Sequence, residues 1–178
     1  MRYVGLLRAV NVGGKHKITM AQLRAALEAL GLEHVRTYIQ SGNVVFESQE
    51  AAAVLQAEIE GLIHHRFGFH TDVILRTITE FDDLIDHCPF LNPSHASTAR
   101  GGLAVAFFAK PPSPEMMAAL GDYAVDGEQY QVRGRDLYLL LPRGTARSKL
   151  VARLQKLGPA TVRNWNTIHK LHALAHDR

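Results

Sequence analysis

The chain alternates between short, mostly apolar stretches, which predict strands, and stretches with an apolar residue at every third or fourth position, which predict helices. Residues 2–9 are mostly apolar, as is typical of a buried strand. Residues 19–30 repeat apolar positions every three or four residues behind the capping-box pair Thr19 and Gln22, and Gly31 follows, so we expect a helix there. The other elements predicted before residue 90 are strands at 34–40, 43–47 and 71–76, a helix that Ser48 caps and that runs to 66, and a helix at 79–87.

The second part of the chain repeats this order after a polar, turn-rich segment at residues 91–101, which we interpret as a linker. Residues 102–109 are typical of an apolar strand, and Ser113 followed by Pro114 is typical of a capped helix start. The further elements predicted are a helix at 114–120, strands at 129–133, 136–141 and 160–163, and helices at 146–156 and 165–176.

Both parts therefore have the order strand, helix, strand, strand, helix, strand, helix. The first six elements of each match the split βαβ pattern (βαββαβ) of ferredoxin-like domains. We predict an α+β protein of two tandem ferredoxin-like units, each with an appended helix, at residues 1–90 and 102–178 with the linker at 91–101. One continuous sheet containing every strand is compatible with the same order of elements.

Composition limits the class of protein. The chain has 178 residues, of which 47% are hydrophobic and 21% charged, as in soluble globular proteins. Cys88 is the only cysteine, which excludes an intramolecular disulfide and favours a reducing compartment, so we expect a cytoplasmic location. Arg8 interrupts the first apolar run, and no run reaches the roughly 18 residues of a membrane helix, so we expect neither a signal peptide nor a membrane partner.

Charge is distributed unevenly. Residues 1–48 carry a net charge of +3, residues 49–130 of −8 and residues 131–178 of +8. A local positive field of this kind attracts phosphate or carboxylate groups. Neutralisation of the basic end by the acidic middle, within the protein, is the alternative interpretation.

Three polar segments, at residues 8–15, 37–43 and 163–167, collect the residue types that hold anions. In a split βαβ unit, the loop after the first strand and the turn between the second and third strands lie at the same end of the sheet, beside the start of the first helix. Basic side chains, amides and backbone N–H groups would then surround one point. The candidate ligand-binding residues are Arg8, Asn11, Gly13, Gly14, Lys15, Ser41, Asn43, Arg163, Asn164 and Asn166.

Each segment also has a purely structural interpretation, and the sequence leaves both open. Gly13 and Gly14 fit a backbone that needs positive φ, and residues 41–43 fit a hairpin turn. Arg163 fits an ion pair and Asn164 a helix cap. The spacings of a Walker loop and of a dinucleotide-binding turn are absent from the sequence, so neither class of nucleotide site is supported.

We expect no metal site and no cofactor. His169, His172 and His176 share one face of the last predicted helix, but no neighbouring cysteine or carboxylate other than Asp177 completes a zinc ligand set. Asp82, Asp83 and Asp86 have side chains that could bind a metal, but a solvated helix face explains them better.

These features favour a protein that binds an anionic ligand, either nucleic acid or a phosphorylated metabolite. A small-molecule enzyme acting on a phosphorylated or carboxylated substrate is an alternative, although the sequence offers it no evident base or nucleophile. A non-catalytic protein-interaction module is the second alternative. The sequence leaves the ligand, any catalysis and the oligomeric state open.

The polar segments also carry a resemblance to a known family. The motifs that carry it are Leu6-Leu7-Arg8 with Asn11-x-Gly13-Gly14, Arg36-Thr37-Tyr38 with Ser41-Gly42-Asn43, Pro89-Phe90, and Arg163-Asn164-Trp165-Asn166-Thr167 with Lys170-Leu171. With these motifs, the chain resembles the bacterial proteins catalogued as domain of unknown function 1697 from residue 2 to about residue 172. This resemblance implies a soluble bacterial α+β protein with a duplicated ferredoxin-like architecture, and it implies no activity.

Overall fold

Two units make up the part of the chain that the computed structural model describes, residues 1–91 and 102–177. Unit 1 comprises Met1–Asp83 and His169–Arg178, and unit 2 comprises Leu84–Ile168. The sequence-based division at 1–90 and 102–178 differs from this, because the end of the chain groups with unit 1 and residues 84–90 group with unit 2. All of the proposed linker except Leu91 lies outside the described residues.

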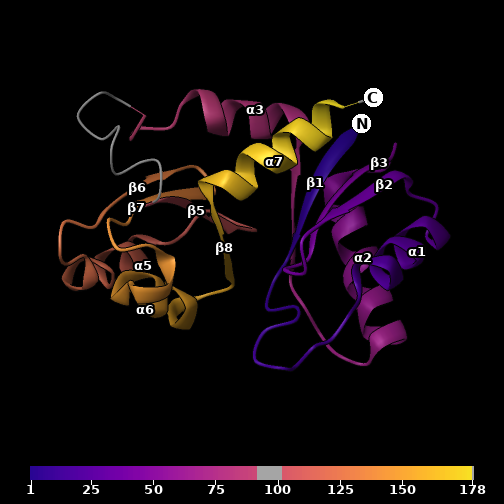
Figure 1. Ribbon diagram of the computed structural model, residues 1–178, viewed down its shortest axis with the longest axis horizontal. Helices are drawn as coiled ribbons and strands as arrows, with labels where there is room; N and C mark the ends of the chain where they lie inside the picture. The colour runs from indigo at the N-terminus through magenta and orange to yellow at the C-terminus, as the bar shows by residue number, and fades with distance from the viewer. Residues whose placement is uncertain (92–101, 178) are drawn as a thin grey trace. The chain divides into compact units, whose positions relative to one another are not determined.

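Unit 1 is built on a four-stranded antiparallel sheet in the order β2-β3-β1-β4, with α1 and α2 on one face (Figure 1). Its strands and helices are β1 (Arg2–Leu7), α1 (Met20–Ala29), β2 (Glu33–Tyr38), β3 (Asn43–Glu47), α2 (Ala52–Phe67) and β4 (Val73–Thr77). The helix α3 (Ile78–Asp86) begins in unit 1 and ends in unit 2, and α7 (Trp165–His176) begins in unit 2 and ends in unit 1.

The core of unit 1 follows from the period of two along its strands. Side chains from alternate strand positions, such as Leu7 and Phe46, pack against apolar residues of the helices, such as Leu27 and Ile59. The other face of the central strands is buried as well. Val4, Leu6, Val45 and Ile74 on that face are at most 3% exposed, so the centre of this sheet has no solvent-exposed face.

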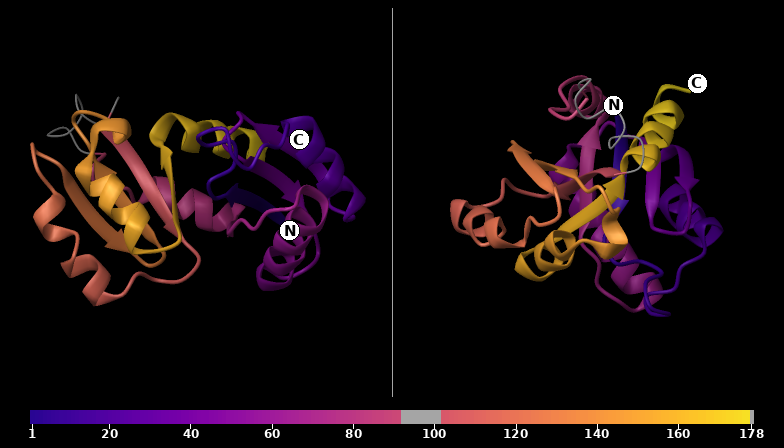
Figure 2. Two further views of the ribbon diagram at one scale, coloured as in Figure 1. Left: turned by 90° about the horizontal axis from the view of Figure 1, so that it is seen from below. Right: turned by 60° about the vertical axis from the view of Figure 1, so that its left-hand side comes forward.

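Unit 2 repeats the order of elements in a second four-stranded antiparallel sheet, β6-β7-β5-β8, so one continuous sheet is ruled out. Figure 2 shows α5 and α6 against one face of this sheet, where the α6 residues Leu150 and Leu154 join the core of the unit. The elements are β5 (Leu103–Phe108), α5 (Pro114–Ala118), the 3₁₀ turn η2 (Gly121–Tyr123), β6 (Gln129–Arg133), β7 (Asp136–Leu140), the 3₁₀ turn η3 (Thr145–Arg147), α6 (Lys149–Leu157) and β8 (Ala160–Asn164).

Helix starts follow the capping chemistry in most cases. Thr19 and Gln22 form the expected capping box, and Ser113 caps α5 through the N–H of Met116. The predicted cap at Ser48 is wrong, because α2 begins three residues later behind an alanine and the Ser48 hydroxyl accepts from the N–H of Glu50 instead. Among the described residues, no helix combines the length and the apolar character that crossing a membrane requires.

Candidate functional site

The loop between β1 and α1 and the turn between β2 and β3 meet at one end of the first sheet. The backbone N–H of Leu7 donates to the carbonyl of Gly42 at 2.8 Å, and Asn11 Nδ2 donates to the carbonyl of Gln40 at 2.7 Å. Gly42 has a φ of +76°, and a Cβ there would lie 2.8 Å from Cβ of Leu7. A glycine is therefore needed for the two segments to approach this closely.

Asn11 holds the β1–α1 loop in place. Its Nδ2 also donates to the carbonyl of Ile18 at 2.8 Å, and its Oδ1 accepts from the N–H of Ile18 at 2.9 Å. Its own N–H donates to the carbonyl of His16 at 3.1 Å. The side-chain amide of Asn11 is thus used inside the loop, where it positions the neighbouring groups.

The same loop is rich in left-handed backbone. A positive φ at alanine or histidine costs about 1–2 kcal/mol, so the loop stores conformational strain. The corresponding loop of unit 2, at residues 109–113, has no positive φ. The ring of His16 stacks on Phe69 with 4.4 Å between centroids, which restrains the loop further. The residues with positive φ are Ala9, Asn11, Gly13, Gly14 and His16.

A hollow of about 450 Å³ opens beside this loop. None of the described residues that line it is acidic, and the first turn of α1 carries no acidic residue either. Positive charge near the start of a helix favours anions. The lining residues are Asn11, Gly14, Lys17, Ile18, Thr19, Gln22 and Gln40.

Charged groups and backbone donors around this hollow are available to a ligand. Lys15 and Lys17 are exposed, and neither has a carboxylate partner within the part of the chain that the structure describes. Within the same described ranges, the N–H groups of Gly13 and Gly14 have no hydrogen-bond acceptor. The candidate ligand residues chosen from the sequence included Lys15 and the two glycines. Lys17, which the topology predicted near Ser41 and Asn43 but which was not chosen as a ligand residue, lines the hollow, and so does Gln40.

Three further candidates in unit 1 have structural partners. Arg8 Nη1 lies 3.1 Å from Asp72 Oδ2 in a half-exposed ion pair. Asn43 is fully buried, and its Nδ2 donates to the Tyr38 carbonyl at 3.0 Å and to Ser41 Oγ at 2.9 Å. Ser41 and Asn43 therefore shape the β2–β3 turn from the inside.

The last three candidates lie together in unit 2. Arg163 is 8% exposed, and its Nη1 donates to Thr161 Oγ1 at 2.7 Å and to the Val162 carbonyl at 3.0 Å. Burial lowers the pKa of Arg163 to about 10. Asn164 accepts from the N–H of Thr167 at 2.8 Å and so caps α7, while Asn166 is exposed.

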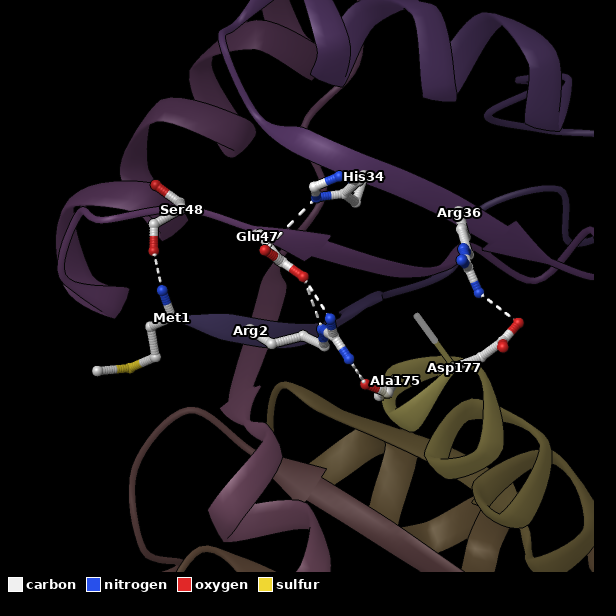
Figure 3. Close-up of polar contacts among 8 residues, drawn as sticks. All are labelled: Met1, Arg2, His34, Arg36, Glu47, Ser48, Ala175 and Asp177. Atoms are coloured by element: carbon white, nitrogen blue, oxygen red, sulfur yellow. Dashed lines mark hydrogen bonds and ion pairs between the residues drawn. The ribbon is translucent and has the colours of Figure 1, made fainter.

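A second, smaller hollow in unit 1, of about 170 Å³, is lined by charges that are already paired. Arg2 donates to the carboxylate of Glu47 and to the carbonyl of Ala175, and Arg36 Nη1 donates to Asp177 Oδ2 at 2.8 Å (Figure 3). The hydrogen bond from Arg2 is the main reason that the pKa of Glu47 lies below its ordinary value. These contacts fasten the end of α7 to the strands, and they leave little charge for a ligand.

Sequence reasoning missed a cluster between α3 and α7. Asp82 was expected on a solvated helix face. Its side chain is 37% exposed, but its Oδ1 also lies 2.8 Å from Nε2 of His172 and 2.8 Å from Nε2 of His176. The histidine spacing is visible in the sequence. The carboxylate is 90 residues from His172, and only the fold brings it there.

Fold and site together define an α+β protein of two four-stranded antiparallel units with a basic, glycine-bearing loop in the first. A family model, described as protein of unknown function (DUF1697), matches residues 1–138, and the chain belongs to this family. Both loops of the first site lie within the matched residues, and the segment from Arg163 lies beyond them.

One similar solved structure is that of the conserved bacterial protein SP0830 from Streptococcus pneumoniae. It is 26% identical to this chain, the match covers 98% of each chain, and the TM-score is 0.77. A comparison with curated proteins found no match.

Proposed function

We propose that unit 1 binds a small phosphorylated or carboxylated metabolite at the β1–α1 loop. The supporting observation is that the free N–H groups of Gly13 and Gly14 lie in the same short loop as Lys15 and Lys17, beside a hollow without acidic lining among the described residues. Backbone donors and ammonium groups together are suited to an oxyanion.

The strain of the loop supports a functional role. The two units share one order of elements, and the loop at residues 109–113 connects its strand and helix without left-handed residues. The fold alone therefore does not require the unusual backbone at residues 9–16. Strain of this kind gathers at sites where the protein fixes a geometry for binding.

A small ligand fits the site better than a nucleic acid does. The hollow of about 450 Å³ has the size of a small-molecule pocket. Sheets that bind single-stranded nucleic acid present exposed aromatic residues on an open face. Here the central strands of the sheet are buried on both faces.

We also infer that each unit is ferredoxin-like. The succession β1-α1-β2-β3-α2-β4, repeated as β5-α5-β6-β7-α6-β8, supports this assignment. In such a unit the β1–α1 loop and the β2–β3 turn share one sheet end, which is where the proposed ligand would lie.

Backbone amide resonances provide the test. We expect ¹⁵N-labelled protein to show movement of the Gly13 and Gly14 amide signals when inorganic phosphate or pyrophosphate is added, and no movement with chloride at equal ionic strength. Lys17→Ala should weaken this binding about 5- to 12-fold, because an exposed charge-assisted hydrogen bond contributes about 1–1.5 kcal/mol. Lys156→Ala, at an exposed lysine of unit 2, is the matched control.

Two outcomes would count against the proposal. If neither phosphate compound nor a panel of carboxylated and phosphorylated metabolites moves the glycine signals, the loop is not an anion site. If only a labelled single-stranded oligonucleotide moves them, with affinity that falls steeply with salt, the ligand is nucleic acid instead.

A further inference from the structure

Two helices of unit 1 bring three potential metal ligands together. Asp82 is the central residue of α3, and His172 and His176 lie in the last half of α7. Both Nε2 atoms point to the same oxygen, Oδ1 of Asp82, at 2.8 Å each. The two imidazole centroids are 4.4 Å apart with the rings tilted by 57°. Side chains at i and i+4 share one helix face, so both rings are directed at α3.

We propose that Asp82, His172 and His176 form a binding site for a divalent transition-metal ion. The three ligand atoms lie within 4.8 Å of one another. Ligand atoms about 2.0–2.2 Å from a tetrahedral zinc ion are about 3.3 Å apart, so each Nε2–Oδ1 distance would open by roughly half an ångström. Each of the three side chains has rotatable χ torsions, which can supply a movement of this size.

The ligand types select the ion. Two imidazole nitrogens and one carboxylate favour zinc, cobalt, nickel or copper over magnesium or calcium, which prefer oxygen ligands. The side chains of Asp82, His172 and His176 are 37%, 32% and 50% exposed, so water can reach the fourth coordination position.

The segment between the two histidines limits what such an ion could do. It is Ala173-Leu174-Ala175, without the glutamate that serves as general base in H-E-x-x-H hydrolases. A role in holding the fold is therefore favoured. The chain leaves unit 1 through α3 and returns through α7. An ion bound by Asp82, His172 and His176 would therefore link the two ends of the chain segment that forms unit 2.

A second group in unit 1, Glu33, His34 and Glu47, has metal-ligand side chains at similar separations. The carboxylate of Glu47 already accepts hydrogen bonds from the guanidinium of Arg2. A metal cation there would replace an existing ion pair and would be repelled by Arg2. This group is the weaker candidate and serves as an internal control.

Cobalt titration of the full-length chain, after removal of metals with EDTA, tests the site. We expect one Co²⁺ per chain with visible d–d absorption, and displacement of Co²⁺ by Zn²⁺. Asp82→Asn, His172→Gln and His176→Gln should each lower the affinity by about 100-fold or more, because loss of a ligand exceeds the roughly 10- to 100-fold cost of losing an outer-shell partner. His65→Gln, at an exposed histidine of α2, and His34→Gln should leave the affinity unchanged.

Because Asp82→Asn can loosen the contact between α3 and α7, the unmodified protein gives a second measurement. The imidazole ¹⁵N resonances of His172 and His176 should shift at Nε2 on addition of one equivalent of Zn²⁺. Unchanged histidine resonances, affinity unaffected by all three ligand variants, or affinity lost in His34→Gln would each overturn the proposal. The cluster would then be a hydrogen-bonded histidine–aspartate contact only.

Discussion

Replacement of Asn11 tests the idea that one side chain organises the β1–α1 loop. Asn11→Ala removes the hydrogen bonds to the carbonyls of Ile18 and Gln40 and the bond from the N–H of Ile18. It also places alanine at a φ of +57°. Asn11→Gly removes the same bonds but tolerates that backbone, so the two variants separate hydrogen bonding from strain.

The magnitude follows from these contacts. Each of the three bonds contributes about 0.5–1 kcal/mol, toward the low end of the usual range, because Asn11 is only partly buried. Left-handed backbone costs alanine about 1–2 kcal/mol. We therefore expect Asn11→Ala to destabilise unit 1 by about 2.5–5 kcal/mol. Asn11→Gly should be less harmful by about 0.5–1 kcal/mol, because glycine avoids the strain but loses about 0.4–1 kcal/mol of stability through the entropy of the unfolded chain.

Native-state hydrogen exchange is the suitable assay, because it reports each unit separately and does not assume that the whole chain unfolds in one step. Exchange of the Leu27 and Ile59 amides reports unit 1, and exchange of the Leu139 amide reports unit 2. Asn166→Ala, at an exposed asparagine in unit 2, is the control. A loss below about 0.5 kcal/mol in Asn11→Ala would refute the role of the side chain, and equal losses in Asn11→Ala and Asn11→Gly would refute the strain.

The other predictions concern the close contact of Gly42 with Leu7, the carboxylate of Glu47 and the helix cap formed by Asn164. Gly42→Ala should destabilise unit 1 by about 2–4 kcal/mol in the same exchange assay, because strain at positive φ adds to the clash with Leu7. The pKa of Glu47 is held below its ordinary 4.5 mainly by the hydrogen bond from Arg2, so the ionised Glu47 contributes fully to stability above pH 4.5, and this contribution is lost as the pH falls through the lower folded-state pKa. Denaturant unfolding at a series of pH values should therefore show that the stability difference between the protein and Glu47→Gln shrinks on acidification. A difference that grows on acidification would contradict the assignment. Asn164→Ala should cost about 0.5–2 kcal/mol in thermal or denaturant unfolding through the lost cap of α7, whereas no loss would show that water replaces the cap.

Secondary structure was largely predictable because its signals are local. The strand at 129–133 and the helix at 165–176 were predicted with the bounds that the structure has. Periodicity and caps are properties of a few adjacent residues, so no tertiary information is needed for them. The predicted cap at Ser48 failed because serine also forms a tight turn with the N–H two residues ahead, and here that alternative is used.

The direction of polar side chains was not predictable from the same local patterns. Asn43 and Arg163 stand in glycine- and asparagine-rich segments, yet Asn43 is fully buried and Arg163 is nearly so. Asn43 begins the central strand β3, which is buried on both faces, and Arg163 lies on the edge strand β8, most of which is buried as well. Polarity alone therefore does not identify an outward position. The topology of the unit predicted Lys17 at this end of the sheet, but Lys17 follows the glycine motif by three residues and has no motif of its own that would mark it as lining a hollow.

The two proposed sites differ in the information that defines them. The anion site is a continuous loop, and its strain appears as positive φ within residues 9–16, so a sequence rich in glycine and asparagine already indicates it. The metal site needs Asp82 on one helix and His176 on another, 94 residues away. The histidine pair is present whether or not the fold supplies a carboxylate, so the pair alone predicts little. The pair becomes part of the proposed metal site only because the chain returns to unit 1 after residue 168. The sequence-based division of the units lacked this return.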